Sequence, residues 1–375
     1  MKRTVALLLA LCLLLCGCGG RDTAPETIAA VETTVAPTTE ATTEPTTEPP
    51  TEPAPVYYNP LTGEEVDAPW TKRVFGVSIG NSKDSLCHFG VSKADILFET
   101  FVNGLTTRRY AMFSDMSAVD SVGGSRSMRL QFTDMTQAYD AIAIYAGGSD
   151  YVIGDLNKSG IEGIIAQQWG ADFHYRAEDR KLAYEHVLMV KGPDVVAYAE
   201  SLGYDVSQDP EKDYGFRFTE AGAPVDGEVA EIITVGLTWG QTVKETVLTY
   251  VQEYEAYTLS QYGIDCVDAY YEVPETFKNI FVLLCNGRTE SVYHMVDTIG
   301  EGEGYYACDG KIIPIKWQRA GETAPFTFTH TDGSQLYQGV GNSYIALATT
   351  QSTVSYTEAQ PVPAQETTPA ETAAE

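Results

Sequence analysis

The sequence predicts an α+β protein in which a layered α/β domain is followed by a mostly antiparallel β domain. Between residues 57 and 209, short apolar runs alternate with amphipathic segments, a pattern typical of strands and helices packed in layers. Beyond residue 209 the chain is rich in Val, Ile, Thr and Tyr and contains Asn-Gly and Asp-Gly pairs, which favour antiparallel hairpins. We therefore predict an α/β domain over residues 57–209 and a β-rich domain over residues 210–355.

The elements of the α/β domain follow from local patterns. The run VFGVSI at 74–79 is almost wholly apolar, as in a buried strand. Met128, Phe132 and Met135 are spaced by four and three residues, which favours a helix, and Gly203 suits the C-terminal cap of another. The predicted strands are 74–79, 94–102, 109–113 and 141–145, and the predicted helices are 127–138, 150–158 and 194–202.

Three turn signals divide the second half of the β domain. Asn286-Gly287, Asp309-Gly310 and Asp332-Gly333 each lie between strand-like runs, and both central residues of a type I′ turn need positive φ. These pairs predict hairpins that join 280–285 to 291–296, 305–308 to 311–317, and 326–331 to 334–337. Further strands are predicted at 230–238, 246–254, 256–259 and 267–273.

The N-terminus predicts export and lipid attachment. Residues 1–17 combine a basic start with an apolar run that is too short to span a bilayer. Gly17 precedes Cys18 as a small residue does in a bacterial lipobox, so Cys18 is the predicted lipidated residue; an ordinary secretory signal is the alternative. The lipid would make the bilayer a partner and hold the protein on the outer face of the cytoplasmic membrane.

Two segments are too poor in apolar residues to fold. Residues 18–56 and 356–375 consist mainly of Thr, Glu, Pro and Ala, so we predict a disordered linker and a disordered tail. The net charge of the chain is −28, which argues against nucleic acid as a partner because phosphate binding needs a basic surface.

The stretch 122–149 contains the candidate ligand site. It holds two Gly-Gly-Ser turns, each predicted to enter a helix, and exposed amides at a helix start attract anions. Arginine suits bidentate contact with carboxylate or phosphate. The candidate ligand-binding residues are Glu99, Arg108, Ser125, Arg126, Ser127, Arg129, Gly147, Gly148, Ser149 and His186. The alternative is that both turns are ordinary corners, with arginines tied to carbonyl oxygens or to Glu99.

Other chemistries have weaker support in the sequence. A hydrolase could use Ser125 or Ser149 with His186 and a neighbouring acid, but no Gly-x-Ser-x-Gly elbow is present. Neither glycine turn continues as a phosphate-binding loop, and no metal-binding or dinucleotide motif occurs, so we expect no metal and no cofactor. Four cysteines remain after processing, either free and buried or partly paired: Cys87, Cys266, Cys285 and Cys308.

Several of these segments resemble the YerB-like bacterial lipoproteins, the two-domain family of unknown function DUF3048. The resemblance is carried by GVSKADILFE at 90–99, Thr107-Arg108, the stretch 122–129, AGGS at 146–149, the histidine at 186, and GEGEGYYACDGKIIPIKW at 300–317. Three positions depart from the family pattern: Asn103, Gly123-Gly124 and Val187. The resemblance implies a two-domain, lipid-anchored layout and brings no established activity.

Together these observations predict a membrane-anchored extracytoplasmic lipoprotein. Its first domain is expected to bind an anionic or peptide-like ligand of the cell wall or envelope. The alternatives are an envelope hydrolase that uses His186 and a structural lipoprotein that acts through partner contacts alone.

Overall fold

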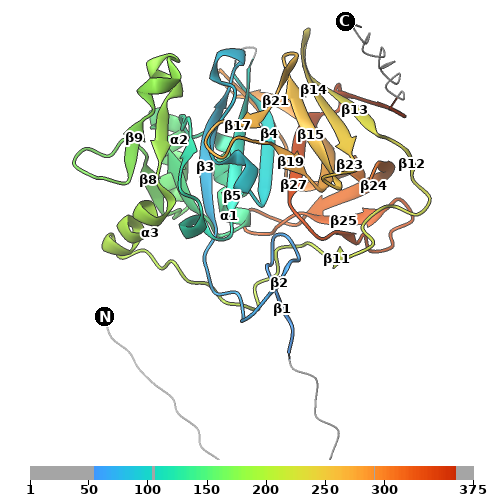
Figure 1. Ribbon diagram of the computed structural model, residues 1–375, viewed down its shortest axis with the longest axis horizontal. Coiled ribbons are helices and arrows are strands. Elements are labelled where there is room, and N and C mark those ends of the chain that lie inside the picture. The colour runs from blue at the N-terminus through green and yellow to red at the C-terminus, as the bar shows by residue number, and fades with distance from the viewer. Residues whose placement is uncertain (1–54, 104–105, 291, 360–375) are drawn as a thin grey trace, which may run out of the picture. The chain divides into compact units, whose positions relative to one another are not determined.

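The computed structural model describes residues 55–103, 106–290 and 292–359. Eleven strands within these ranges form one large sheet, which contains segments from both halves of the chain (Figure 1). Along the sheet the order is β12 (Glu228–Val229), β24 (Lys311–Arg319), β23 (Gly300–Cys308), β20 (Asn279–Cys285), β27 (Ser343–Thr349), β4 (Ile96–Asn103), β5 (Thr106–Phe113), β3 (Phe75–Asn81), β7 (Ile142–Tyr145) and β8 (Gly163–Ile165), with β25 (Thr327–His330) paired to β24.

The large sheet is mixed, and β27 joins its two halves. This strand runs parallel to both β20 and β4, and β3, β7 and β8 are also mutually parallel. The remaining pairs in the sheet are antiparallel. The fold class predicted from the sequence is therefore confirmed: an α/β part is followed by a mostly antiparallel part.

A second sheet packs against one face of the large one. Its order is β16 (Ile264–Asp265), β15 (Ala256–Gln261), β14 (Thr242–Val251), β13 (Ile232–Trp239) and β28 (Thr353–Thr357), with β19 (Thr276–Phe277) paired to β15. The smaller pairings are β6 (Val122–Gly123), β10 (Leu188–Val190) and β9 (His174–Arg176); β1 (Tyr57–Tyr58) with β2 (Glu65–Val66); β11 (Phe218–Thr219) with β26 (Gln338–Gly339); β17 (Val267–Asp268) with β18 (Val273–Pro274); and β21 (Gly287–Glu290) with β22 (Tyr293–Val296).

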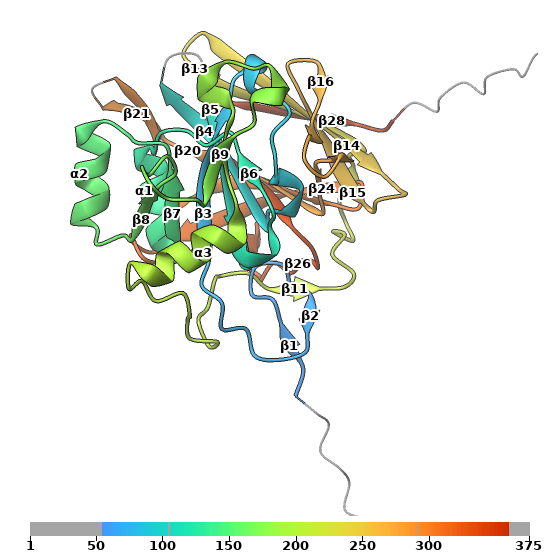
Figure 2. The same cartoon turned by 60° about the vertical axis from the view of Figure 1, so that its left-hand side comes forward.

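In the described part of the chain, three α-helices cover the two faces of the large sheet (Figure 2). Helices α1 (Leu130–Ala138) and α2 (Asp150–Lys158) share one apolar core with Phe98 and Tyr110, whereas α3 (Gly192–Ser201) shares the other with Leu97 and Ala111. Neighbouring residues of one strand therefore point into different cores, as the pleat requires. Short 3₁₀ turns lie at Lys83–Ser85, Val91–Lys93, Met116–Ala118, Glu178–Arg180 and Tyr184–His186.

Most predicted elements are present, and four details of the prediction are wrong. Helix α1 begins at Leu130, not at residue 127. The segment 267–273 contributes only the short strands β17 and β18. After Asp332-Gly333 the second strand is reduced to a single bridge, Thr329 to Gln335.

The fourth error concerns the predicted hairpin at Asn286-Gly287. Gly287 instead opens β21, which pairs with β22, while β20 has β23 on one edge and β27 on the other. A strand with both edges occupied cannot also pair with the segment after it. The Asp309-Gly310 turn is as predicted, with φ of 49° and 73°.

No helix among the described residues is long and apolar enough to cross a membrane. The predicted signal peptide, Cys18 and nearly all of the linker and tail lie outside the described residues.

The buried carboxyl of Asp95 gives the fold a pH-dependent weakness. Burial, with the charges of Glu64 and Asp115, raises the pKa of Asp95 to about 6, although the Ser114 N–H donates to its carboxylate at 2.5 Å. Because the folded-state pKa exceeds the unfolded value of 3.8, stability is lost as the pH rises from about 4 through 6.

We expect Asp95→Asn to be more stable than wild type by about 1–2 kcal/mol at pH 8 and no more stable at pH 4. The amide cannot ionise but keeps an oxygen that can accept the Ser114 N–H. Urea unfolding of both proteins at the two pH values measures the difference. A gain that does not change with pH would contradict the role given to Asp95.

Candidate functional site

The first Gly-Gly-Ser turn lies between strands and not at the start of a helix. Gly123 belongs to β6, and Ser125 forms a bridge to Ile79 of β3. The backbone N–H groups of Gly123, Ser125 and Arg126 donate to carbonyl oxygens of neighbouring segments at 2.8–3.0 Å. The prediction that this turn enters a helix is therefore wrong, and these three N–H groups are not free to bind an anion.

The second turn does begin a helix, but its serine is occupied. Ser149 caps α2 by accepting from the Val152 N–H at 3.4 Å, and its Oγ also receives the Tyr293 hydroxyl at 2.6 Å. The carbonyl oxygen of Gly147 accepts from the Met128 N–H, which ties this turn to the chain before α1. Gly147, Gly148 and Ser149 thus form a structural corner beside the first turn.

Arginines gather around the carbonyl oxygen of Ser127. Arg108 Nη1 donates to it at 2.6 Å, and Arg129 Nη1 contacts it at 3.4 Å while donating to the Met128 oxygen at 2.8 Å. The Ser78 hydroxyl donates to the same oxygen at 3.1 Å. Three donors on one carbonyl fix the backbone at Ser127, so Arg108 and Arg129 have a structural role.

A pocket of about 440 Å³, here called the arginine pocket, opens beside this cluster. Arg126 and Arg176 each donate one hydrogen bond to a backbone carbonyl oxygen of the pocket wall. Arg126 Nη1 donates to the backbone oxygen of Glu185 at 3.1 Å, and Arg176 Nη1 donates to the backbone oxygen of Tyr184 at 2.6 Å. The guanidinium of Arg176 also lies 3.4 Å from the centre of the Tyr184 ring. The lining residues are Ser125, Arg126, Ser127, Ala146, Gln167, Arg176, Tyr184, Glu185 and Leu188.

Neither Arg108, Arg126 nor Arg176 forms a direct ion pair within the described ranges, although the Glu185 carboxylate lines the pocket. A hydrogen bond from its own backbone N–H and the charge of Arg126 lower the pKa of Glu185. Burial lowers the pKa of Arg108 well below its ordinary value, and Arg129 and Arg126 lower it further. Arg108 is not part of the pocket lining, in which the guanidiniums of Arg126 and Arg176 face one carboxylate, Glu185. The lining therefore has one excess positive charge, which suits an anion.

Ser125 adds a neutral donor to the pocket. Its side chain is 1% exposed, and its Oγ has no hydrogen-bond partner among the residues that the structure describes. Leaving a buried hydroxyl unpaired costs about 1–3 kcal/mol. Arginine forks beside a hydroxyl are chemically suited to carboxylate or phosphate.

His186 lies beside the pocket but not in its lining. Burial lowers the pKa of His186, and the charge of Arg126 lowers it further, so the imidazole is neutral near pH 7. In the described part of the chain its ring forms no hydrogen bond with a serine or a carboxylate, and Nδ1 is buried without a partner. The geometry gives no specific support to a triad.

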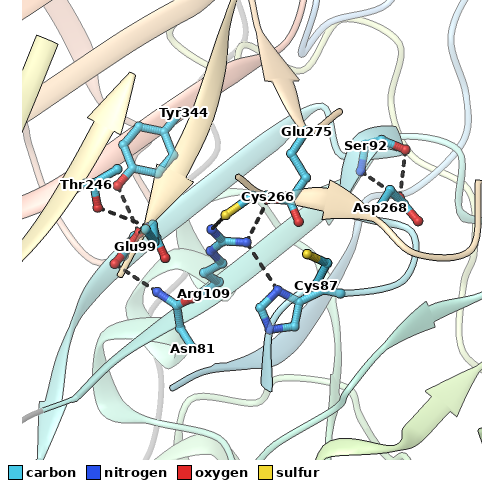
Figure 3. Close-up of polar contacts among 12 residues, drawn as sticks. Asn81, Cys87, Ser92, Glu99, Arg109, Thr246, Cys266, Asp268, Glu275 and Tyr344 are labelled. Atoms are coloured by element: carbon cyan, nitrogen blue, oxygen red, sulfur yellow. Dashed lines mark hydrogen bonds and ion pairs between the residues drawn. The ribbon is translucent and has the colours of Figure 1, made fainter. Parts of the chain in front are cut away.

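Glu99 lies on the opposite face of the large sheet from Arg108. It pairs in register with Arg109, and neighbouring residues on β5 point to opposite faces. The predicted candidates are therefore divided: the Ser125–Arg129 cluster lies on the α1 side, whereas Glu99 faces the second sheet. Figure 3 shows Glu99 between Asn81 and Tyr344, with the Arg109 guanidinium nearby.

Glu99 is fully buried and accepts five hydrogen bonds. The donors are Asn81 Nδ2 (2.9 Å), Thr107 Oγ1 (2.7 Å), Lys244 Nζ (2.5 Å), Gln261 Nε2 (2.6 Å) and the Tyr344 hydroxyl (2.9 Å). Burial alone would raise the pKa of Glu99, but Lys244 and Arg109 lower it to about 2. Burial lowers the pKa of Lys244 to about 8, against the pull of Glu99. This buried charge cluster joins the two sheets.

Arg109 forms a second buried ion pair beside the first. Its Nη1 donates to Glu275 at 2.8 Å and lies 3.2 Å from His88 Nδ1, and its Nη2 donates to Cys266 Sγ at 3.5 Å. Burial and the charge of Arg109 hold the pKa of His88 well below its ordinary value, so His88 is neutral and can accept. The pair is inaccessible to ligand, because Arg109 and Glu275 are both 0% exposed.

Several residues of the two sites were not among the sequence candidates. Lys244 could have been found from the sequence, because it alternates with Thr246 and Leu248 on the buried face of β14. Arg109 likewise shares the phase of Ala111 and Phe113 on β5. No feature of the sequence marked Arg176 and Gln167 as site residues, because only the fold brings them to the pocket.

The described residues contain no cluster of three or more His, Cys, Asp or Glu side chains suited to a metal. The four cysteines within this range are all free thiols, and Cys266, Cys285 and Cys308 are buried. The sequence had left open whether they were free or paired.

Comparison with known proteins places the chain in a family. The sequence profile of the DUF3048 N-terminal domain matches residues 61–205, and that of the DUF3048 C-terminal domain matches residues 235–345. The chain belongs to this two-domain family, whose function is unknown.

Two comparisons involve one bacterial relative. The chain is 24% identical over 275 residues to "Putative lipoprotein YerB" of Bacillus subtilis, covering 69% of this chain and 77% of that protein. The crystal structure of the Bacillus subtilis YerB protein matches with a TM-score of 0.67 at 22% identity, covering 80% of this chain and 99% of that chain. The structural match supports the fold.

Proposed function

We propose that this protein is an extracytoplasmic lipoprotein that binds an anionic or peptide-like ligand of the cell envelope in the arginine pocket. In this proposal a lipid on Cys18 anchors it to the outer face of the cytoplasmic membrane. The anchor is supported by the Gly17-Cys18 lipobox pattern and by the name of the Bacillus subtilis relative.

The observation that carries the binding proposal is the excess of positive charge at the pocket, where two guanidiniums face the single carboxylate of Glu185. The protein has 52 acidic residues against 24 basic ones, yet Arg126 and Arg176 line a pocket without an ion pair in the described structure. Each guanidinium donates one hydrogen bond to a wall carbonyl, which fixes its position and leaves further N–H groups for a ligand. Ser125 also contributes to the lining of this pocket.

Binding screens of the full-length chain in detergent test this proposal. The probes are inorganic phosphate, acetylated acidic dipeptides and muropeptides, measured by calorimetry. We expect Arg126→Ala and Arg176→Ala each to weaken binding by roughly tenfold or more, since hydrogen bonds to charged groups contribute about 1.5–3 kcal/mol.

The matched control is Arg288→Ala. Arg288 is exposed and already paired with Asp297 and Glu290, so its removal is expected to leave binding unchanged. Equal affinities of all four proteins for every probe that binds would refute the assignment of the pocket. Loss of radiolabelled palmitate incorporation in Cys18→Ala cells tests the anchor separately.

A further inference from the structure

A second pocket among the described residues has a volume of about 540 Å³ and is here called the aromatic pocket. It is formed by the β1–β2 hairpin, by the segment 212–220 that contains β11, and by Val340. Most of its lining falls outside the stretches matched by the two family domains. The lining residues are Tyr58, Asn59, Pro60, Gly63, Glu65, Lys212, Asp213, Tyr214, Phe216, Arg217, Phe218, Thr219, Glu220 and Val340.

The frame of the aromatic pocket is rigidly held. The Asn59 side chain accepts from the Leu61 N–H at 2.9 Å and donates to Ser114 Oγ at 2.9 Å, which fastens the hairpin to the protein. Gly63 has φ of 72°, and a Cβ there would lie 2.3 Å from Phe218 Cγ, so the Phe218 ring lies against the turn. The pocket is therefore preformed, as small-molecule sites usually are.

Aromatic rings form its walls and rest on the core. Phe218 and Phe216 have ring centroids 6.0 Å apart, and Phe216 packs in turn against the buried Phe328 at 6.1 Å. Tyr58 stands at the rim with 55% of its surface exposed. Tyr58 is exposed and Phe218 is partly exposed, and aromatic rings are suited to stacking because their faces carry negative charge and attract weakly positive C–H groups.

The polar groups of the aromatic pocket are nearly balanced in charge. Two cationic and three acidic side chains line it, whereas two cationic and one acidic side chain line the arginine pocket. Arg217 and Asp213 form a two-pronged ion pair at 2.9 and 2.7 Å, which places donors and acceptors side by side in a fixed geometry. Such a pair can bond two neighbouring hydroxyl groups at once, whereas it has no excess charge with which to hold an ion.

We infer that the aromatic pocket binds an uncharged oligosaccharide. The C–H face of one sugar ring would stack on Tyr58 and Phe218, and its hydroxyl groups would bond to Asp213 and Arg217. This site lies apart from the arginine pocket, with which it shares no lining residue, and its function does not depend on the one proposed there.

Titration of full-length protein in detergent tests this inference, with chitotetraose, cellotetraose and maltotetraose as probes and ligand-observed NMR and calorimetry as readouts. We expect at least one sugar to bind and Tyr58→Ala to weaken it fivefold or more. Tyr58→Phe keeps the ring and should bind within twofold of wild type. Tyr254→Ala removes a similarly exposed tyrosine on a distant hairpin and is the matched control.

Three results would overturn the inference. The first is that none of the three sugars binds. The second is that Tyr58→Ala binds as well as wild type while its melting temperature is unchanged. The third is binding of an uncharged proline-rich tetrapeptide with no sugar bound. Arg126→Ala should leave sugar binding intact, so failure here and failure of the arginine pocket are distinguishable.

Discussion

Replacing Lys244 with methionine is expected to destabilise the protein by about 3–5 kcal/mol, because it leaves a buried carboxylate without its partner. Lys244 Nζ lies 2.5 Å from Glu99 Oε1, and both side chains are buried between the two sheets. Four neutral donors would remain on Glu99, but they cannot replace the charge. Guanidinium unfolding of the variant measures the loss.

A double variant and a surface control define the cause. Lys316→Met removes an exposed strand lysine and should change stability by less than about 0.5 kcal/mol. Glu99→Gln combined with Lys244→Met should be more stable than Lys244→Met alone, because no unpaired charge is then buried. If the double variant were as unstable as the two single losses added together, the charge itself would not be the cause.

Replacing Arg109 with methionine is expected to cost a similar 3–5 kcal/mol, with a marked dependence on pH. Its partner Glu275 already has a raised pKa, because burial outweighs the attraction of Arg109. Without Arg109 that pKa rises further, so the folded protein takes up a proton as the pH falls. The loss should therefore be largest near pH 8 and smaller near pH 5.

Thermal unfolding across this pH range measures the dependence. Arg288→Met, which removes an exposed arginine, is the control and should show little loss at any pH. Adding Glu275→Gln to Arg109→Met should restore part of the stability at pH 8. A loss of equal size at every pH would show that packing, and not the Glu275 charge, accounts for the effect.

Local sequence patterns predicted most helices and strands. Which strands pair with each other depends on contacts between distant parts of the chain, and that was not predicted. Helix α2 has its predicted bounds because Ser149 caps it and its apolar residues keep helical phase. The hairpin at Asn286-Gly287 failed because β27, far along the chain, occupies the edge of β20. A turn signal reports the local backbone preference and carries no information about which strand edges remain open.

In the candidate site, too, contacts between residues close in sequence were predicted and contacts between distant residues were not. Ser125, Arg126 and Ser127 were predicted together and do line one pocket. Glu99 was singled out as a charge among apolar neighbours, but its partner Lys244 lies 145 residues away, on the other sheet. The sequence left open a contact between Glu99 and one of the candidate arginines, whereas the pleat of β4 and β5 turns Glu99 and Arg108 to opposite faces.

The central claim is that the arginine pocket holds an anion, and NMR of arginine side chains tests it most directly. Full-length ¹⁵N-labelled protein in detergent is titrated with inorganic phosphate and with muramyl dipeptide, and the Nε–Hε signals are assigned by single substitutions. We predict that Arg126 and Arg176 shift together and saturate for at least one probe, along with the Ser125 amide, while Arg288 does not move. Saturable binding that leaves Arg126 and Arg176 unshifted, or shifts Arg288 equally, would contradict the account.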